Sequence, residues 1–215
     1  MTYLEIVNDV LKRLREPTVS SVNDTLYSKM IGVFVNDAKR DVEDAHEWNA
    51  LSNTLTATTT ADVFNYILVG SQNRFRVIDV LNDSENTVMQ YRPTHWMNRA
   101  FLLTTQQKAA PMYYNFNGVD AAGDTQVDIY PIPDKAYTLR FNVIMPQPDL
   151  VADTDKIEVP GHLASMLAYS KAIAERGEDG GVQASEAYLQ YRLALADAVA
   201  IERNRYDEEV TWIGV

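Results

Sequence analysis

The apolar residues of the segment 24–48 recur at the three- and four-residue spacing of an α-helix. This stripe consists of Tyr27, Ile31, Phe34, Ala38, Val42, Ala45 and Trp48. A helix of this length spans about 37 Å, so the rest of the chain is predicted to be organised around it. Ser21 and Asp24 stand at capping-box spacing and are expected to cap its first turn.

The opposite face of the same helix carries charged residues. They are Asp37, Lys39, Arg40, Asp41, Glu43, Asp44 and Glu47. Lys39 and Glu43, like Arg40 and Asp44, are four residues apart, where opposite charges meet on a helix. We interpret this face as solvated. A metal-binding carboxylate cluster is the alternative, but the nearest histidine, His46, belongs to neither a paired-His nor a Glu-x-x-His pattern.

A shorter helix is predicted before it, at residues 3–15. Thr2 and Glu5 have the spacing of a capping box at its start. Pro17 ends it, because proline excludes the preceding residue from helical geometry. The polar connector 18–23 has a length that folds two helices back on each other, so the chain is expected to open with a helical hairpin.

After Trp48 the pattern changes from helical spacing to alternation, which favours β-strands. Strands are predicted at residues 54–60, 63–68, 75–81, 87–91, 126–130 and 137–145. A short helix is predicted at 94–103, with Trp96 and Phe101 packing inward. The even spacing of strands and turns favours an antiparallel meander or a small barrel.

Two more helices are predicted at 160–176, ended by Gly177, and at 182–205. The second carries two apolar stripes. They consist of Ala184, Tyr188, Tyr191, Leu195 and Val199, and of Leu189, Leu193, Ala196 and Ala200. So wide an apolar surface indicates either deep burial within this lobe or contact with another subunit. For the second interpretation, the candidate subunit-interface residues are Tyr188, Leu189 and Leu193.

The predicted fold class is therefore α+β, with a helical bundle from both chain ends and an inserted antiparallel β domain. The helical domain is expected to comprise residues 1–51 and 157–215, including a C-terminal docking tail, and the β domain residues 52–150.

Charge and composition narrow the function classes. A net charge of -11 and a pI near 4.7 argue against a surface that grips nucleic acid, which would show clustered lysine and arginine. Cysteine is absent, so disulfides and thiolate metal sites are excluded. No apolar run approaches a membrane span and the N-terminus does not resemble a signal peptide, so we expect assembly in the cytoplasm and no membrane partner.

Motifs that carry chemistry are missing from the sequence. It has no nucleophile elbow, phosphate loop, dinucleotide fingerprint or zinc-helix motif. His46, His95 and His162 fall in three different predicted elements, and the acidic run 207–209 is best interpreted as solubilising the chain end. We therefore predict no catalytic residues, no cofactor and no metal.

Four segments give the chain a family resemblance. They are MTYLEIVNDVLKRLRE, LYSKMIGVFVNDAKRDVEDAHEWNAL, VDIYPIPDKAYTLRFNV and DKIEVPGHLASMLAYSKAIAERGED. In this order they resemble the head-to-tail adaptor (connector) proteins of short-tailed bacteriophages, the tail tubular protein A-like family. The resemblance spans nearly the whole chain, although each motif alone is unspecific.

The resemblance implies a virion protein at the head–tail junction, assembled in the host cytoplasm. It implies a dodecameric ring that attaches below the portal protein, extends the DNA channel and carries the tail tube or nozzle protein, with no catalytic residues. Double-stranded DNA is expected to pass without specific binding, since an acidic wall repels phosphate. In this family the C-terminal segment commonly docks on the portal, and the candidate docking residues are Tyr206, Trp212 and Ile213.

Two other functions stay open at the level of sequence. A tail-tube or tail-completion protein would share the acidity, the ring and the lack of motifs. A cell-wall hydrolase using carboxylates as acid and base is a more remote alternative.

Overall fold

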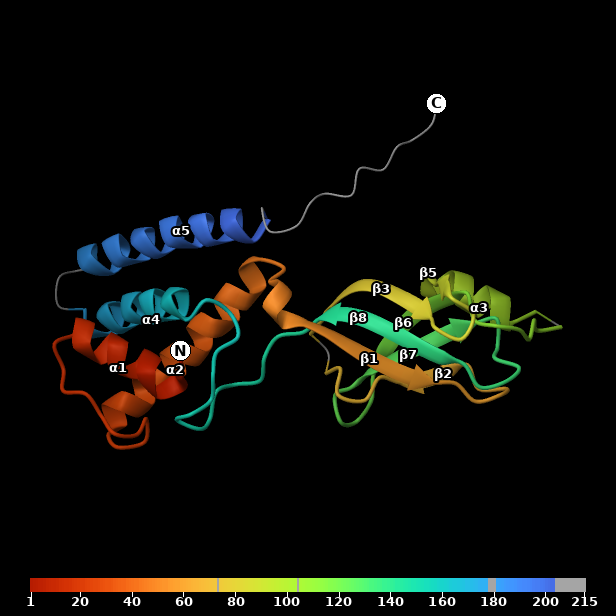
Figure 1. The fold of residues 1–215 in the computed structure, drawn as a ribbon, viewed down its shortest axis with the longest axis horizontal. Helices are drawn as coiled ribbons and strands as arrows, with labels where there is room; N and C mark the ends of the chain where they lie inside the picture. Colours follow the sequence, from red (N-terminus) through yellow and green to blue (C-terminus); the bar gives the residue numbers. More distant parts are fainter. Residues whose placement is uncertain (73, 104, 178–180, 204–215) are drawn as a thin grey trace, which may run out of the picture. The chain divides into compact units, whose positions relative to one another are not determined.

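The computed structural model describes residues 1–72, 74–103, 105–177 and 181–203. The chain forms two compact units: residues 1–51 together with 146–215, and residues 52–145. Along the sequence, helices precede and follow a central β region, and the helices of both chain ends belong to the same unit (Figure 1). This confirms the predicted α+β fold class. Residues 146–150, which we expected in the β region, group with the helices.

Helix α1 (Tyr3–Arg13) begins with the predicted capping box. The backbone N–H of Thr2 donates to the Glu5 carboxylate at 2.8 Å, and the N–H of Glu5 donates to the Thr2 hydroxyl at 3.2 Å. The helix ends two residues earlier than predicted, because Leu14 is its C-cap and Arg15 adopts a positive φ of 60° that no helix continues.

Helix α2 (Leu26–Ala45) is capped differently from our expectation. Thr25 and Ser28 form its capping box, with the N–H of Ser28 donating to the Thr25 hydroxyl at 2.9 Å. The predicted cap by Ser21 and Asp24 is wrong. Asp24 instead accepts from the N–H of Ser21 at 2.8 Å and so closes the preceding turn.

The buried stripe of α2 largely follows the sequence prediction. Ile31, Ala38, Val42 and Trp48 are buried, whereas Ala45 is exposed. The residue Asn49 begins a short 3₁₀ turn, η1 (Asn49–Leu51), that leads out of the helical unit.

Helix α4 (Gly161–Arg176) contacts each of the other helices of its unit, α1, α2 and α5 (Val182–Arg203). Figure 1 shows α5 running alongside α4. Gly177 ends α4 as predicted, since it adopts the left-handed φ of 63° that suits glycine. Within the described part of the chain, no helix combines the length and apolarity needed to cross a membrane.

The β unit consists of two four-stranded sheets, with orders β1-β8-β3-β4 and β2-β7-β6-β5. The strands are β1 (Ser52–Thr58), β2 (Asn65–Ile67), β3 (Arg76–Asn82), β4 (Thr87–Val88), β5 (Gln90–Tyr91), β6 (Tyr113–Val119), β7 (Thr125–Tyr130) and β8 (Thr138–Ile144). The predicted meander or barrel is wrong, because strands far apart in sequence are neighbours and β5 runs parallel to β6. Alternation indicates strands but not their partners.

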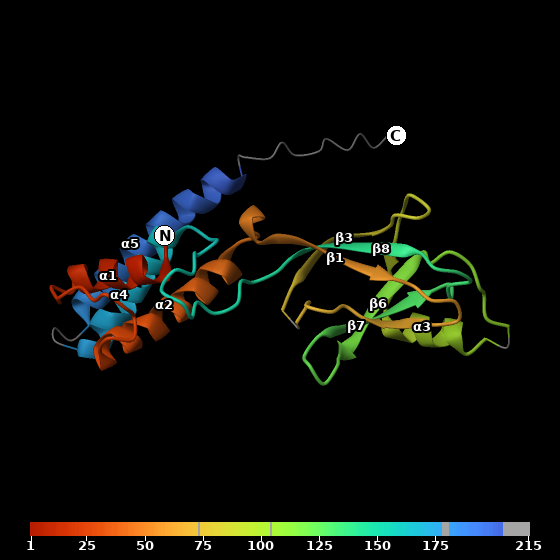
Figure 2. The same ribbon diagram turned by 60° about the horizontal axis from the view of Figure 1, so that its bottom comes forward.

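Residues from both sheets share one core, which includes Val80, Val127, Leu139 and Phe141. Helix α3 (Thr94–Phe101) lies beside β6 and β7 (Figure 2). As predicted, Trp96 and Phe101 pack inward, where they join a smaller cluster with Tyr130.

Strand β6 was missing from the sequence prediction. Its second residue, Tyr114, is buried in the core of the β unit. Asn115 is also buried and donates to the Thr94 hydroxyl at 3.0 Å. Two asparagines and Gly118 interrupt the apolar alternation, which hides the strand from a pattern search.

Candidate interaction surfaces

Helix α5 has a covered side and an open side. Ala184, Ala187 and Tyr191 are buried on the side that faces the bundle. Leu189 and Leu193 point the other way and are 62 % and 70 % exposed. Val182 lies on the same open side, because it precedes Leu189 by two helical turns. We call Val182, Leu189 and Leu193 the outer face of α5. Burial within the helical unit, one of the two interpretations of this helix, is therefore wrong for both leucines.

Tyr188, the third candidate interface residue, lies on a different side of α5. It lines a groove of about 390 Å³ between α5, α4 and α2, together with Tyr191 and Leu195. The rings of Tyr188 and Tyr191 are 5.9 Å apart. The structure therefore brings Leu189 and Leu193 together and separates Tyr188 from them.

An ion pair spans the groove. Lys171 and Asp41, on opposite walls, form an ion pair at 2.8 Å. Burial raises the pKa of the Tyr191 hydroxyl, and the nearby negative charge of Asp41 adds to this effect. The phenol thus stays protonated and cannot serve as a general base. The groove is best described as a seam between helices.

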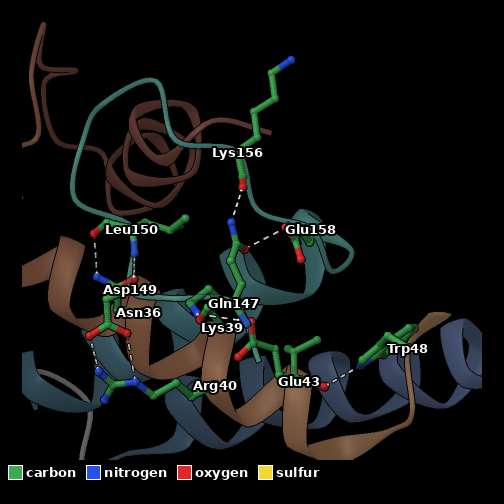
Figure 3. A network of polar contacts seen from close by, with 11 residues as sticks. Asn36, Lys39, Arg40, Glu43, Trp48, Gln147, Asp149, Leu150, Lys156 and Glu158 are labelled. Carbon is green, nitrogen blue, oxygen red and sulfur yellow. Dashed lines mark hydrogen bonds and ion pairs between the residues drawn. The ribbon is translucent and has the colours of Figure 1, made fainter. Parts of the chain in front are cut away.

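A buried polar network occupies the other side of α2 (Figure 3). The side chains of Lys39 and Glu43 are 0 % and 2 % exposed and pair at 3.2 Å between Nζ and Oε1. Our prediction that these residues face water is wrong. The reason is the segment after β8: the Lys39 ammonium donates to the carbonyl of Gln147, and the N–H of Gln147 donates to Glu43 at 3.2 Å.

Gln147 extends the network toward α4. Its side-chain amide donates to the carbonyl of Lys156 at 2.6 Å and accepts from the N–H of Glu158 at 3.1 Å. Asn36 bonds both backbone groups of Leu150, at 3.1 Å and 2.9 Å. These contacts tie α2 to residues 147–158, the part of the chain that returns to the helices.

The electrostatics of Glu43 reflect this position. Burial raises the pKa of its carboxyl, while the charge and hydrogen bond of Lys39 oppose the shift. Among the described residues, its Oε2 atom is buried without a hydrogen-bond partner. A carboxyl with a raised pKa can act as a catalytic acid, but this one is closed off from any substrate. We assign it a structural role.

A second stripe on α2 would have revealed this network. Ser28, Gly32, Val35, Lys39 and Glu43 follow one another at helical spacing, and all five are buried. The first three residues of this stripe, Ser28, Gly32 and Val35, carry no charge, which indicates a buried side of the helix. The charged residues Lys39 and Glu43 at its end led us to assign this side of the helix to solvent.

The three histidines stay apart, as expected. His46 is the C-cap of α2 and meets the Trp48 ring edge-on, with centroids 5.3 Å apart. His95 lies in α3 and His162 in the first turn of α4. In the described ranges, no three histidine or acidic side chains cluster in a way that could hold a metal ion.

The predicted portal-docking residues Tyr206, Trp212 and Ile213, and the acidic run 207–209, lie outside the described residues.

The chain was compared with curated proteins and with protein-family models. No curated protein matches the chain. The family model described as SU10 adaptor protein matches residues 1–212, nearly the whole chain. That family consists of phage head–tail adaptors, in agreement with the resemblance of the four sequence segments. The chain therefore belongs to the SU10 adaptor protein family and is a structural component of a phage virion.

Proposed function

We propose that this protein is a non-enzymatic, ring-forming head-to-tail adaptor that attaches below the portal, extends the DNA channel and provides the platform for the tail. Family membership supports the adaptor role. The observation that carries ring formation is the outer face of α5, where two leucines a helical turn apart stand in solvent.

An exposed apolar row on a long helix is characteristic of an interaction site. Fully burying a leucine side chain stabilises an assembly by about 1.5 to 3 kcal/mol. Isolated apolar residues are common on protein surfaces, but a row at helical spacing gives a partner one continuous surface to pack against. On this basis Leu189 and Leu193 belong to the subunit interface, and Tyr188 supports it from the adjoining groove.

The charge of the chain suits a channel for double-stranded DNA. With 30 acidic and 19 basic residues, the protein lacks the excess of cations that would release counterions from phosphate. DNA therefore passes without specific binding. An attractive wall would retain the genome through many phosphate contacts.

The C-terminal segment is the proposed contact with the portal. Tyr206, Trp212 and Ile213 would anchor it, since large aromatic side chains supply much of the binding energy at small interfaces. The acidic run 207–209 would steer the segment toward a basic rim.

The experiment that tests ring formation replaces Leu189 and Leu193 by aspartate. We expect a folded protein that no longer forms rings, because an interface charge disfavours association more than it disturbs an exposed helix face. Circular dichroism checks the fold, and negative-stain images with and without purified portal check the rings.

The control is Val151→Asp, which places the same charge on an exposed apolar residue outside α5. This variant should assemble like the wild type. Rings of the Leu189/Leu193 variant with normal stability would contradict the proposed interface, and rings that stack without capping the portal would indicate a tail-tube protein instead.

A further inference from the structure

Strand β1 is the one long edge strand among the described strands of the β unit. The sheet order β1-β8-β3-β4 leaves one side of β1 without a neighbouring strand, and β1 has seven residues. The other edge strands are short: β4 and β5 have two residues each, and β2 has three. Because an unpaired edge binds other extended chains, natural proteins keep such edges short or place charges, prolines or bulges on them.

Strand β1 has none of these protections along its length. The segment Ser52–Thr58 contains no charged residue and no proline, and it pairs with β8 in one unbroken register. By contrast, the register of β3 with β8 shifts between Val77 and Asp79. The outer edge of β1 therefore has the features of a strand that another extended chain covers.

Every second residue of β1 presents its backbone groups to the open edge. Thr59, just after the strand, donates its N–H to the carbonyl of Tyr137 on the β8 side at 2.8 Å. Backbone groups alternate between the two sides of an antiparallel strand, which fixes the residues that face away from β8. They are Thr54, Thr56 and Thr58. The N–H of the first of them bonds the side chain of Asn53 at 2.7 Å, a local contact that an incoming strand can displace.

We infer that this edge pairs in the antiparallel direction with β1 of a second copy, centred on Thr56. The five residues 54–58 read T-L-T-A-T, almost the same in both directions. In a pair centred on Thr56, threonine meets threonine on the solvent side, and Leu55 meets Ala57 on the core side. Leu55 and Ala57 are only partly buried and pack against the core of the β unit, so the second strand would extend this apolar side.

Charge does not oppose this pairing. Strand β1 is uncharged, so a second copy of it brings no charge to the contact. On the neighbouring strand, Arg140 lies opposite Thr56 and pairs with Asp83 at 2.9 Å. The two Arg140 residues of a pair would lie three strand spacings apart, about 14 Å, beyond the screening length of about 8 Å at physiological ionic strength. Asp62, the first charged residue after β1, is paired with Lys108 at 2.5 Å.

The inferred contact has a symmetry of its own. The same strand lies on both sides of it, so a twofold axis relates the two copies. Such a contact joins two copies and cannot alone close a larger ring. It is separate from the proposed ring contact on α5 and does not rest on it. The pair would cover the long edge in the free protein, before a ring forms.

A single introduced cysteine tests the pairing directly, because the chain has none of its own. In the inferred pair, the two residues at position 56 exchange hydrogen bonds, which places their Cα atoms about 5.5 Å apart, a separation that a disulfide spans. Thr56→Cys should therefore form a covalent dimer on mild oxidation. The matched control is Val88→Cys, on the exposed opposite edge of the same sheet, which should remain monomeric on denaturing gels.

Two further cysteine variants test direction and register. Thr54→Cys should not cross-link with itself, and neither should Thr58→Cys. A mixture of the two should cross-link, because these positions face each other only in an antiparallel pair centred on Thr56. Self-linking of Thr54→Cys would show a parallel arrangement and contradict the inferred one.

Removing one outward N–H gives a measurement that does not depend on cross-linking. Thr56→Pro deletes a donor that faces away from β8, a position where sheet edges tolerate proline. The test uses the variant with Leu189→Asp and Leu193→Asp, which lacks the proposed ring contact. In this background, sedimentation equilibrium should show a dimer. Adding Thr56→Pro should abolish the dimer, whereas Thr56→Val, which keeps the N–H, should not, and circular dichroism checks that both variants fold.

The outcomes distinguish this inference from the proposed function. If Thr56→Cys cross-links no more than Val88→Cys, the inference is wrong whether or not rings form. If Thr56→Pro leaves the free protein unchanged but prevents binding to portal, a strand of the portal covers the edge and the second copy is the wrong occupant. If cross-linking succeeds and the wild type still forms no ring with or without portal, the proposed function alone fails.

Discussion

Lys39 and Glu43 form an ion pair inside the helical unit, where neither side chain reaches water. Such a pair is weak evidence for stability, because desolvation of both charges offsets their attraction. Its value here is positional: both groups also bond the backbone of Gln147 and so select one register for the returning chain. Removing a single partner would leave a buried charge unpaired.

We predict that Lys39→Met destabilises the helical unit by about 3 to 5 kcal/mol, the usual cost of breaking a buried pair. Urea unfolding followed by circular dichroism measures this. The control, Lys171→Met, removes a more exposed partner of Asp41 and should cost about 1 kcal/mol or less. The double variant Lys39→Met with Glu43→Leu should be more stable than Lys39→Met, because it leaves no unpaired buried charge. If Lys39→Met and the double variant lost the same free energy of unfolding, the proposed pairing would be wrong.

The raised pKa of Glu43 predicts a pH effect of definite sign. Below its unfolded-state value near 4.5, the carboxyl is neutral in both the folded and the unfolded chain. As pH rises from there through the higher folded-state pKa, the carboxyl ionises first in the unfolded chain, so folding must reprotonate it or bury it as a carboxylate, and stability conferred by the neutral form is lost. As pH rises, the free energy of unfolding of the wild type should therefore fall relative to that of Glu43→Gln, which cannot ionise at this position. Urea titrations between pH 4 and pH 8 measure this difference, and a constant difference would contradict it.

Among the elements, α2 combines length with an unusual feature, a glycine near its middle. Gly32 is buried, although glycine lowers helix stability relative to alanine. A Cβ atom at this position would collide with the hydroxyl of Tyr3 on α1 and press against Val22. The glycine is therefore required by the close approach of α1 and not by helix formation.

We predict that Gly32→Ala destabilises the protein by about 1 to 3 kcal/mol despite its better helix propensity, as overpacking usually does. Thermal unfolding measures this. Adding Tyr3→Phe removes the oxygen atom that the new methyl group meets and should recover part of the loss. A stabilised Gly32→Ala variant would show that α1 and α2 can separate freely at this point.

On the scale of the whole molecule, two compact units share one chain. We propose that they are the helical and β domains of the adaptor, with the helical domain supplying the ring contacts. The C-terminal segment then gives the ring a separate means to hold the portal. An apolar pair such as Trp212 and Ile213 gains stability when a partner covers it.

We predict that deleting residues 206–215 leaves fold and solubility intact but abolishes co-sedimentation with portal. Trp212→Ala should account for most of this loss, because it removes the aromatic anchor. The matched control is Trp212→Phe, which keeps an aromatic ring and should retain most binding. A truncated protein that still caps the portal would place docking in the helices or the β unit.

Most helices and strands could be predicted, because their apolar periodicity depends on residues that are close in sequence. The helices at both ends, the Thr2 capping box, the stop at Gly177 and most strands follow from spacing and turn chemistry, which act over a few residues. The adaptor family, in contrast, was indicated by the resemblance of four segments and their order, and not by spacing or turn chemistry.

Tertiary structure decided which surfaces meet. Lys39 and Glu43 look solvated in sequence, and only contact with Gln147, more than a hundred residues away, makes them interior. Strand order followed pairings such as β1 with β8, which alternation cannot specify. Both stripes of α5 are apolar, yet Ala184 and Tyr191 are buried whereas Leu189 and Leu193 are exposed, because a helix packs only one side against a neighbouring helix. Periodicity identifies the faces of an element; the neighbours that cover each face come from distant parts of the chain.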